Sequence, residues 1–444
     1  MHVSQIASQP RPAAVGAARS VGAAELVLLV LTLIVFTEGL LPRLVASEQS
    51  TDGSPILRAL WLPLYALIAV GLIWRVREIA RVCVRLPFLM GLLVLTALSF
   101  LWSIDPGLTQ RRSVALLMTS AAGLYLGTRY DWKTLLRALG AVWLMVGLAS
   151  FVTALVVPEF GRAQDVHAGA WQGLYFEKNQ LGGHMALAVL ITAFLGLMDR
   201  RFRGIWLSGF ALSALLVLMS TSKTALLAMG LGLAVLGIGA LMKRGVRTSL
   251  AVLWVSGVTT ALLGMILWLS PALVFEALGR DASLTGRTDI WAVLVDYIKE
   301  RPLLGYGYGA FWAEGSGPGA WVRETLQRDA PPAHNGWLDV ALALGAVGLV
   351  LLVLDFSMTL IRAVLAAFQT WLGVFVLAFC AQFILFSLSE SVSLQQNSIL
   401  WVIYVALAAK LTSRPQGLFA TKPAWPDLSV WSQRSAGLAA TRQT

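Results

Sequence analysis

Charged residues are scarce in this chain. Only 13% of its 444 residues are Asp, Glu, Lys or Arg, whereas 57% are hydrophobic. Soluble domains carry about a quarter charged residues, so this chain has too few charges to cover the surface of two or three such domains. The scarcity excludes a cytosolic enzyme, and a mean hydropathy of +0.74 favours a polytopic membrane protein.

Cysteine, histidine and paired aspartates are also rare. The two cysteines, Cys83 and Cys380, provide neither a disulfide framework nor a metal-binding set, which excludes a secreted disulfide scaffold. The 4 histidines share no metal-ligand spacing, and no Asp-x-Asp pair occurs. We therefore expect no metal and no cofactor, and a nucleotide-sugar enzyme that depends on a divalent cation is disfavoured.

Long apolar runs dominate the sequence. A helix that crosses a bilayer needs about 20 mainly apolar residues, and about 12 segments meet this requirement. We therefore predict an all-α, polytopic membrane protein. The predicted transmembrane segments are 24–41, 56–74, 86–102, 112–128, 138–157, 180–198, 204–220, 224–242, 250–269, 336–354, 370–388 and 398–411.

The distribution of Lys and Arg predicts the orientation of these helices. With the N-terminus in the cytoplasm, most of the 34 Lys and Arg residues fall on the inner side. The inner basic residues include Arg75, Arg85, Arg137, Lys243 and Arg362. The net charge of +11 then reflects topology and attraction to anionic lipids, and no nucleic-acid partner is expected. The predicted organisation is an inner segment (1–23), helices one to nine (24–269), a long outer loop (270–335), helices ten to twelve (336–411) and an inner tail (412–444).

The long outer loop has the composition of a folded segment. Apolar side chains at helical spacing predict an amphipathic helix over 288–300, which Pro302 ends. Arg287 would stand at its N-terminus, where the helix dipole disfavours a cation but backbone N–H groups favour an anion. It is a candidate phosphate-binding residue; the alternative is a surface arginine paired with Asp281 or Asp289. A small aromatic core is predicted from Trp291, Tyr297, Tyr306, Tyr308, Phe311, Trp312 and Trp321.

Three alternate glycines follow this predicted helix, at Gly305, Gly307 and Gly309. A dinucleotide-binding loop would need a preceding strand and a βαβ unit, and neither is predicted here. The pattern instead predicts a tight turn whose tyrosines rest at the lipid–water interface.

Three further polar residues stand where apolar segments meet the outer surface. His334 and Asn335 precede the segment that starts at 336; the imidazole could act as a general base or cap the helix. Lys178 and Lys223 precede two other helices, where lysines commonly snorkel to water. Because Arg287, Lys178, Lys223 and His334 share the outer side, together they could hold a lipid-linked phosphate without a metal.

These residues resemble the O-antigen ligase/polymerase superfamily (Wzy/WaaL type). Its pattern of His-Asn, nine residues, Gly, two residues and Gly is matched by His334-Asn335, Gly345 and Gly348. The stretches 284–291 and 302–309 are similar to the family's loop motif, and the segments 103–106, 178–179 and 220–225 also fit. Within the superfamily, 284–291 together with 305–312 most resembles exopolysaccharide polymerases of the ExoQ type.

The resemblance implies a GT-C-like fold in the bacterial inner membrane. Transfer would occur on the periplasmic face, with both termini in the cytoplasm, from a glycan carried by undecaprenyl diphosphate. The reaction would be inverting and metal-independent. Carried over by position, Arg287 would bind the donor diphosphate, assisted by Lys178 and Lys223. His334, supported by Asn335, would activate or orient the acceptor hydroxyl.

The resemblance leaves the acceptor open. A polymerase transfers the chain to another lipid-linked repeat unit, a ligase transfers it to lipid A-core, and a third branch of the superfamily transfers it to protein Ser or Thr. The ExoQ-type motif favours a polymerase of exopolysaccharide or O-antigen repeat units, with membrane lipids and a polysaccharide export complex as further partners. A transporter or flippase is the alternative outside the superfamily, but transporters concentrate charges near the midplane, where this chain has few.

Overall fold

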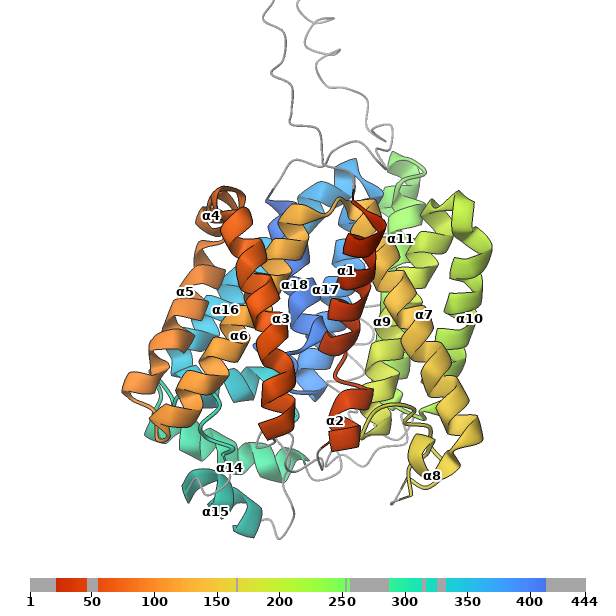
Figure 1. The fold of residues 1–444 in the computed structure, drawn as a ribbon. Coiled ribbons are helices and arrows are strands. Elements are labelled where there is room, and N and C mark those ends of the chain that lie inside the picture. Colours follow the sequence, from red (N-terminus) through yellow and green to blue (C-terminus); the bar gives the residue numbers. More distant parts are fainter. Residues whose placement is uncertain are drawn as a thin grey trace, which may run out of the picture.

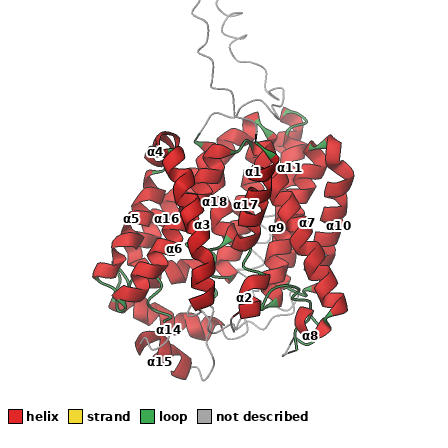
Figure 2. Cartoon of the chain, viewed as in Figure 1, coloured by secondary structure: helices red, strands yellow, loops and turns green. Residues whose placement is uncertain are grey.

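The computed structural model describes residues 21–45, 55–164, 167–251, 254–255, 287–313, 317–325 and 333–412 of the chain. Over this part of the chain the regular structure is helical throughout and contains no strand (Figure 2). One isolated bridge joins Arg162 to Trp171. The prediction of an all-α protein is confirmed.

The long helices stand side by side in one bundle (Figure 1). Among the described residues, 7 helices are long and apolar enough to cross a membrane, or up to 8 if the bent pair α4 and α5 forms one span. The polytopic prediction is therefore confirmed. The count of twelve stays a prediction, because most of the expected segment 250–269 lies outside the described residues. The helices are α1 (Ala23–Phe36), α2 (Leu40–Val45), α3 (Pro55–Trp74), α4 (Val76–Val84), α5 (Pro87–Leu98), α6 (Pro106–Arg129), α7 (Trp132–Val156), α8 (Pro158–Gly161), α9 (Lys178–Met198), α10 (Arg203–Met219), α11 (Lys223–Met242), α14 (Arg287–Glu300), α15 (Gly317–Thr325), α16 (Gly336–Gln369), α17 (Trp371–Ser389) and α18 (Ile399–Leu411).

Helix α18 lies in the interior of the bundle. Its residues from Ile399 to Lys410 are all buried. It packs against α6, where Gly127 permits close approach: a Cβ at this position would lie 2.8 Å from the carbonyl oxygen of Ala406. Small residues at helix contacts are the usual way in which transmembrane helices approach each other. The short α18 is thus held by neighbouring helices.

A buried glutamine joins three of the helices. Gln382 on α17 donates through Nε2 to the carbonyl oxygens of Ala186 on α9 (3.2 Å) and Ala228 on α11 (3.0 Å). Gly232 leaves room for this amide, since a Cβ there would lie 2.5 Å from Nε2. Interhelical hydrogen bonds of this kind hold helices together in an apolar environment. They fix α9, α11 and α17 relative to each other.

The cations that the sequence assigns to the inner side gather at one end of the bundle, which we call the basic end. They donate to backbone carbonyls close to where helices finish. The pairs are Arg75–Thr128 (3.1 Å), Arg85–Thr412 (2.8 Å), Lys243–Ala367 (2.9 Å) and Arg362–Arg85 (2.7 Å). Helices α14 and α15 lie at the opposite end, together with α2 and α8 (Figure 1). The compartment that each end faces stays a prediction.

Two elements differ from expectation. The residues expected to form a connection before the third span instead form α4, whose Ile79 and Val82 are buried; this helix is too short and too basic to register as an apolar segment. Helix α16 was expected to end at 354 but continues to Gln369. Asp355 interrupts the apolar run there, yet its carboxylate accepts a hydrogen bond from Tyr404 (2.6 Å), so the helix continues.

Candidate functional site

His334 and Glu390 form a hydrogen-bond contact at the end of the bundle opposite the basic end. The Nδ1 atom of His334 lies 2.9 Å from Oε2 of Glu390, and the two side chains are 19% and 23% exposed. Because an ionised carboxylate only accepts hydrogen bonds, Nδ1 is the donor, and Nε2 carries the lone pair of the neutral ring. The arrangement orients a weakly exposed imidazole with one nitrogen available. We call this end the His334 end.

The backbone at His334 explains how the ring is positioned. His334 has φ +46, in the left-handed region that few residues other than glycine adopt. The next residue, Asn335, caps α16: its side-chain oxygen accepts from the backbone N–H of Trp337 (3.0 Å) and Leu338 (3.3 Å). The helix is therefore capped by Asn335 and not by His334, whose imidazole contacts Glu390 instead.

The first turn of α16 is also joined to the chain that follows α17. Asp339 accepts a hydrogen bond from Nε1 of Trp312 (2.9 Å) and one from Ser391. Gly336 lies against Ser393, where a Cβ would come within 2.9 Å of the Ser393 hydroxyl oxygen. These contacts hold the start of α16 beside the residue that pairs with His334.

The connection between α17 and α18 gathers further contacts from distant parts of the chain. Its Leu394 carbonyl accepts from the hydroxyl of Tyr308 (2.5 Å), and its Asn397 side chain accepts from Tyr65 (2.6 Å). Sequence reasoning did not identify this connection or Glu390. The available signal was a carboxylate directly after an apolar segment, on the same predicted side as His334.

The glycine-rich segment closes a break in α16. Gly345 has φ +63 and interrupts the helix. Residues on either side of the break bond to the glycine-rich segment and not to their own helix: Tyr306 N–H to Leu342 O (2.8 Å), Gly307 N–H to Ala343 O (3.0 Å), Ala346 N–H to Pro302 O (2.8 Å) and Val347 N–H to Leu303 O (3.2 Å). The segment thus satisfies the backbone groups that the break exposes, as a membrane interior requires.

Tyrosines in this segment were predicted to rest at the lipid–water interface, and this prediction is wrong. Tyr306 and Tyr308 are only 3% and 8% exposed. The hydroxyl of Tyr306 donates to the carbonyl of Tyr297 (3.0 Å) and to Glu300 (2.9 Å). Burial and the hydrogen bond to Glu300 raise the pKa of Tyr306 above its usual value, so this phenol stays neutral and serves packing.

Helix α14 confirms the predicted amphipathic helix and begins at Arg287. The side chain of Arg287 lies outside the described residues, so its contacts are not part of the described site. Ile290 and Leu294 of α14 pack in a small cluster with Tyr306 and Phe311. The expected aromatic core is therefore present, except that Trp321 is exposed and Tyr308 packs with the main bundle.

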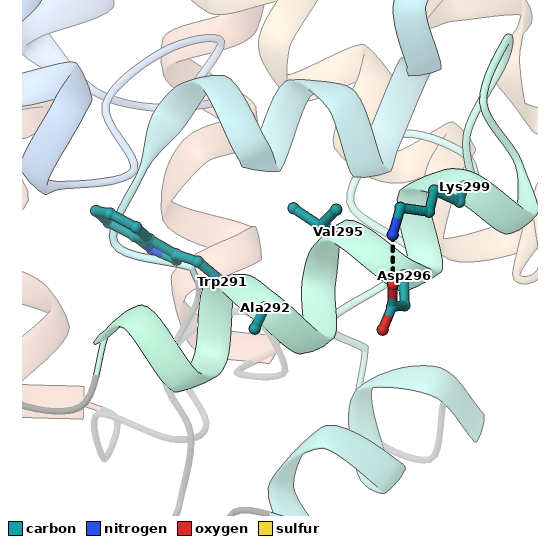
Figure 3. A pocket seen from close by; sticks show the side chains of 5 residues that line it. All are labelled: Trp291, Ala292, Val295, Asp296 and Lys299. Atoms are coloured by element: carbon teal, nitrogen blue, oxygen red, sulfur yellow. Dashed lines mark hydrogen bonds and ion pairs between the residues drawn. The ribbon is translucent and has the colours of Figure 1, made fainter. Parts of the chain in front are cut away.

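An open groove follows one side of α14. It has a volume of about 460 Å³ and is lined by Trp291, Ala292, Val295, Asp296 and Lys299 (Figure 3). The indole Nε1 of Trp291 donates to the carbonyl of Ala333 (2.9 Å), the residue before His334. Lys299 and Asp296 form a salt bridge (2.8 Å) within the groove. The groove thus offers an aromatic ring near the His334–Glu390 pair and polar groups further along.

Lys178 and Lys223 are the first residues of α9 and α11. The structure brings these two helix starts together. The ammonium of Lys178 donates to the hydroxyl of Thr221 (3.4 Å), two residues before Lys223. Gly182 on α9 packs against the same turn, since a Cβ there would lie 2.8 Å from Ala225 Cβ. Lys178 and Lys223 therefore occupy one neighbourhood.

This neighbourhood and the His334–Glu390 pair lie at the same end of the bundle. Gly183 on α9 faces the ring of Phe386 on α17, where a Cβ would come within 3.6 Å of it. The backbone N–H of Glu390 donates to the carbonyl of Phe386 (2.7 Å). The starts of α9 and α11, the end of α17 and the start of α16 thus converge, which joins three of the predicted site positions. Within the described residues, no group of three His, Cys, Asp or Glu side chains is placed to hold a metal.

Comparison with known proteins shows similarity to one family. Residues 208–353 match the family model described as O-Antigen ligase; the matched region contains Lys223, Arg287 and His334. The exopolysaccharide production protein ExoQ of Rhizobium meliloti (strain 1021) is 26% identical over 306 residues, which cover 66% of this chain and 67% of that protein. These similarities relate the chain to the O-antigen ligase/polymerase superfamily and, within it, to ExoQ.

Proposed function

We propose that the protein polymerises exopolysaccharide or O-antigen repeat units on the periplasmic face of the inner membrane. Its donor is a glycan on undecaprenyl diphosphate, and its acceptor is a second lipid-linked glycan. The match to an O-antigen ligase model and the similarity to an exopolysaccharide production protein support this class of reaction. The choice of donor, acceptor and side is our inference from the residues.

The observation that carries the proposal is the contact of His334 with Glu390 at 2.9 Å. The acceptor hydroxyl oxygen attacks the anomeric carbon of the donor sugar and forms the new glycosidic bond. Nε2 of His334 takes the hydroxyl proton as a general base. Glu390 holds the other nitrogen and stabilises the imidazolium that results, as carboxylates do in other His-based catalytic groups.

The leaving group is undecaprenyl diphosphate, which departs with the electron pair of the broken carbon–oxygen bond. Lys178, Lys223 and Arg287 each begin a helix. A helix start attracts anions through its free N–H groups and its dipole, and a cation there adds to this attraction. We assign the three residues to the diphosphate, whose developing charge they stabilise without a metal.

The groove beside Trp291 would bind a sugar of the growing chain. Its indole is fixed by the hydrogen bond to Ala333 (2.9 Å), and one face of an aromatic ring can stack on a sugar. The Asp296–Lys299 pair supplies hydrogen-bonding groups for sugar hydroxyls. The groove therefore supports an extended glycan as substrate.

Deleting the gene and analysing the extracted glycolipids tests the reaction. We expect single repeat units on undecaprenyl diphosphate and no polymer. A ligase is the second candidate, because the matching family model carries that description; it predicts polymer that accumulates on undecaprenyl diphosphate. The accumulation of polymer would refute polymerisation and establish ligation.

Reporter fusions test the side of the membrane. A reporter fused after Gly315 should be active in the periplasm, and one fused after Arg247 should be active in the cytoplasm. A cytoplasmic signal from the fusion after Gly315 would refute the proposed topology and, with it, periplasmic transfer.

A further inference from the structure

A separate polar pocket lies at the basic end of the bundle. It has a volume of about 260 Å³ and forms where α16 finishes, α17 starts, α18 finishes and α7 starts. Its polar lining comes from Arg362, Gln369, Thr370, Lys410 and Thr412, and among the described residues no Asp or Glu lines it. A pocket with two cations and no acid among its lining residues is suited to an anion.

The ammonium of Lys410 is buried, with the residue only 9% exposed. It donates to the carbonyl of Tyr130 (2.5 Å) and lies 5.0 Å from the centre of the Trp132 ring. Hydrogen bonds to neutral groups do not neutralise a buried charge, which is costly unless a counter-charge is near. Asp131 is the acidic group that acts electrostatically on Lys410, and a bound anion in the pocket would add a second counter-charge.

The guanidinium of Arg362 has a nitrogen that no described residue satisfies. Its Nη2 donates to the carbonyl of Arg85 (2.7 Å). Its Nη1 is buried and has no hydrogen-bond partner among the described residues. Buried donors in folded proteins are rarely left without an acceptor. Asp355 is the acidic group that interacts electrostatically with Arg362, and a phosphate in the pocket would offer this guanidinium a further acceptor.

The start of α17 adds free backbone donors. Thr370 caps the helix by accepting from the N–H of Gly373 (3.2 Å), while the N–H groups of the residues between them have no acceptor within an α-helix. Gly373 and Leu372 line the pocket. The positive end of the helix dipole therefore faces the same space as the two cations.

We propose that this pocket binds the phosphate of an anionic membrane lipid. The phosphate would accept from Arg362, Lys410 and the start of α17, while Leu365 and Leu411, which also line the pocket, would contact the apolar part of the lipid. Basic pockets between transmembrane helices are known to take lipid headgroups. A lipid is favoured over free phosphate because the pocket combines these apolar residues with cations at one end of a membrane bundle.

The test uses the full chain, purified in detergent and titrated separately with phosphatidylglycerol, phosphatidylcholine and inorganic phosphate. Phosphatidylglycerol should raise the thermal unfolding midpoint, because a ligand that binds the folded state stabilises it. It should also remain bound in native mass spectrometry. The doubly substituted Lys410→Gln/Arg362→Gln protein should lose both effects. The rise should be absent with phosphatidylcholine and with inorganic phosphate.

A matched control removes two charges elsewhere at the same end. Arg200→Gln/Arg203→Gln changes two exposed arginines and should keep the full response to phosphatidylglycerol. If both double variants lose the response to phosphatidylglycerol equally, the proposed site is wrong. It is also wrong if phosphatidylcholine raises the unfolding midpoint as much as phosphatidylglycerol does. A full response to inorganic phosphate alone would overturn the lipid assignment. Should the Lys410 substitution prevent folding, Arg362→Gln alone must weaken lipid retention, and unchanged retention would refute the proposal.

Discussion

The two ends of the bundle differ in where several of their cations stand on helices. At the basic end, several cations donate to carbonyls at or near helix C-termini, such as Arg85 to Thr412 and Lys243 to Ala367, although Arg203 begins α10 there. At the His334 end, Lys178 and Lys223 are the first residues of α9 and α11. A cation at a C-terminus stabilises the helix, whereas one at an N-terminus opposes the helix dipole.

This difference separates structural cations from candidate binding residues. The cations at helix ends join α4, α6, α16 and α18 to one another. We therefore expect them to contribute to the free energy of unfolding. A cation at a helix start opposes the helix dipole, and a bound anion there would offset this cost. Helix position therefore helps to indicate function where charge alone does not. The predictions below can contradict this distinction or sharpen it.

His334→Ala should have the largest effect, because it removes the proposed base. A general base contributes roughly 10²–10⁴ in rate, so we expect a loss of this size in kcat, measured with purified protein and lipid-linked repeats. Binding of the donor should be retained. His167→Ala changes an exposed histidine before α9 and serves as the control. A His334→Ala protein that transfers glycan at a normal rate would contradict the proposed mechanism.

Arg287→Ala should weaken both donor binding and transfer, because it removes a cation from a helix start. By analogy with an oxyanion-hole donor, the loss should be roughly 2–4 kcal/mol of transition-state stabilisation. Arg287→Lys should recover only part of it, since the bidentate fork is lost. Arg200→Ala, an exposed arginine at the basic end, is the control. Equal losses in the two alanine variants would erase the distinction between the ends.

Glu390→Gln should lower kcat and leave KM nearly unchanged, because Glu390 acts through the imidazole and not on the substrate. A hydrogen bond to a charged group is worth about 1.5–3 kcal/mol, which corresponds to roughly ten- to a hundredfold in rate. Glu390→Asp should restore part of the rate. Glu159→Gln alters an exposed carboxylate on α8 as the control. A purely structural role would instead lower the unfolding temperature without this split between kcat and KM.

Asp199→Asn should affect stability alone, because Asp199 belongs to the basic end. Its carboxylate accepts from Nε and Nη2 of Arg137 (2.7 Å each) and from Trp206 (3.1 Å). The hydrogen bond from Arg137 lowers the pKa of Asp199. At neutral pH the variant should unfold more easily by about 1.5–3 kcal/mol, with kcat per folded protein unchanged.

The difference in stability between the wild type and Asp199→Asn should depend on pH, because the pKa of Asp199 is lowered in the folded protein. The stabilisation is complete above the usual aspartate pKa of about 3.9 and is lost as the pH falls through the lower pKa of the folded protein. The unfolding midpoints of the wild type and Asp199→Asn, measured in detergent, should therefore converge upon acidification. If the two unfolding midpoints still differ in strong acid, the negative charge of Asp199 is not the source of the stabilisation.

Sequence patterns predicted the parts of the fold that depend on local periodicity. The helix at Arg287–Glu300 follows from apolar residues at helical spacing. The partner of His334 was missed because Glu390 lies 56 residues further along the chain. A single sequence contains no periodic signal for a contact of that separation.

The burial of Tyr306 could not be predicted for a related reason. The glycine pattern correctly predicted a tight turn, but the place where the turn packs depends on the break at Gly345. That break is visible only once the two segments are seen together. The long apolar run around Gly345 is compatible with an uninterrupted helix, so the sequence favours the simpler interpretation.

The break at Gly345 makes one helix depend on a segment outside it. The carbonyls of Leu342 and Ala343 accept from the segment 302–307, and the N–H groups of Ala346 and Val347 donate to it. Unsatisfied backbone groups are costly in a lipid interior, so the break is tolerated only where that segment is packed against it. The first half of α16, which begins next to His334, is therefore held in place by a part of the chain that precedes the helix.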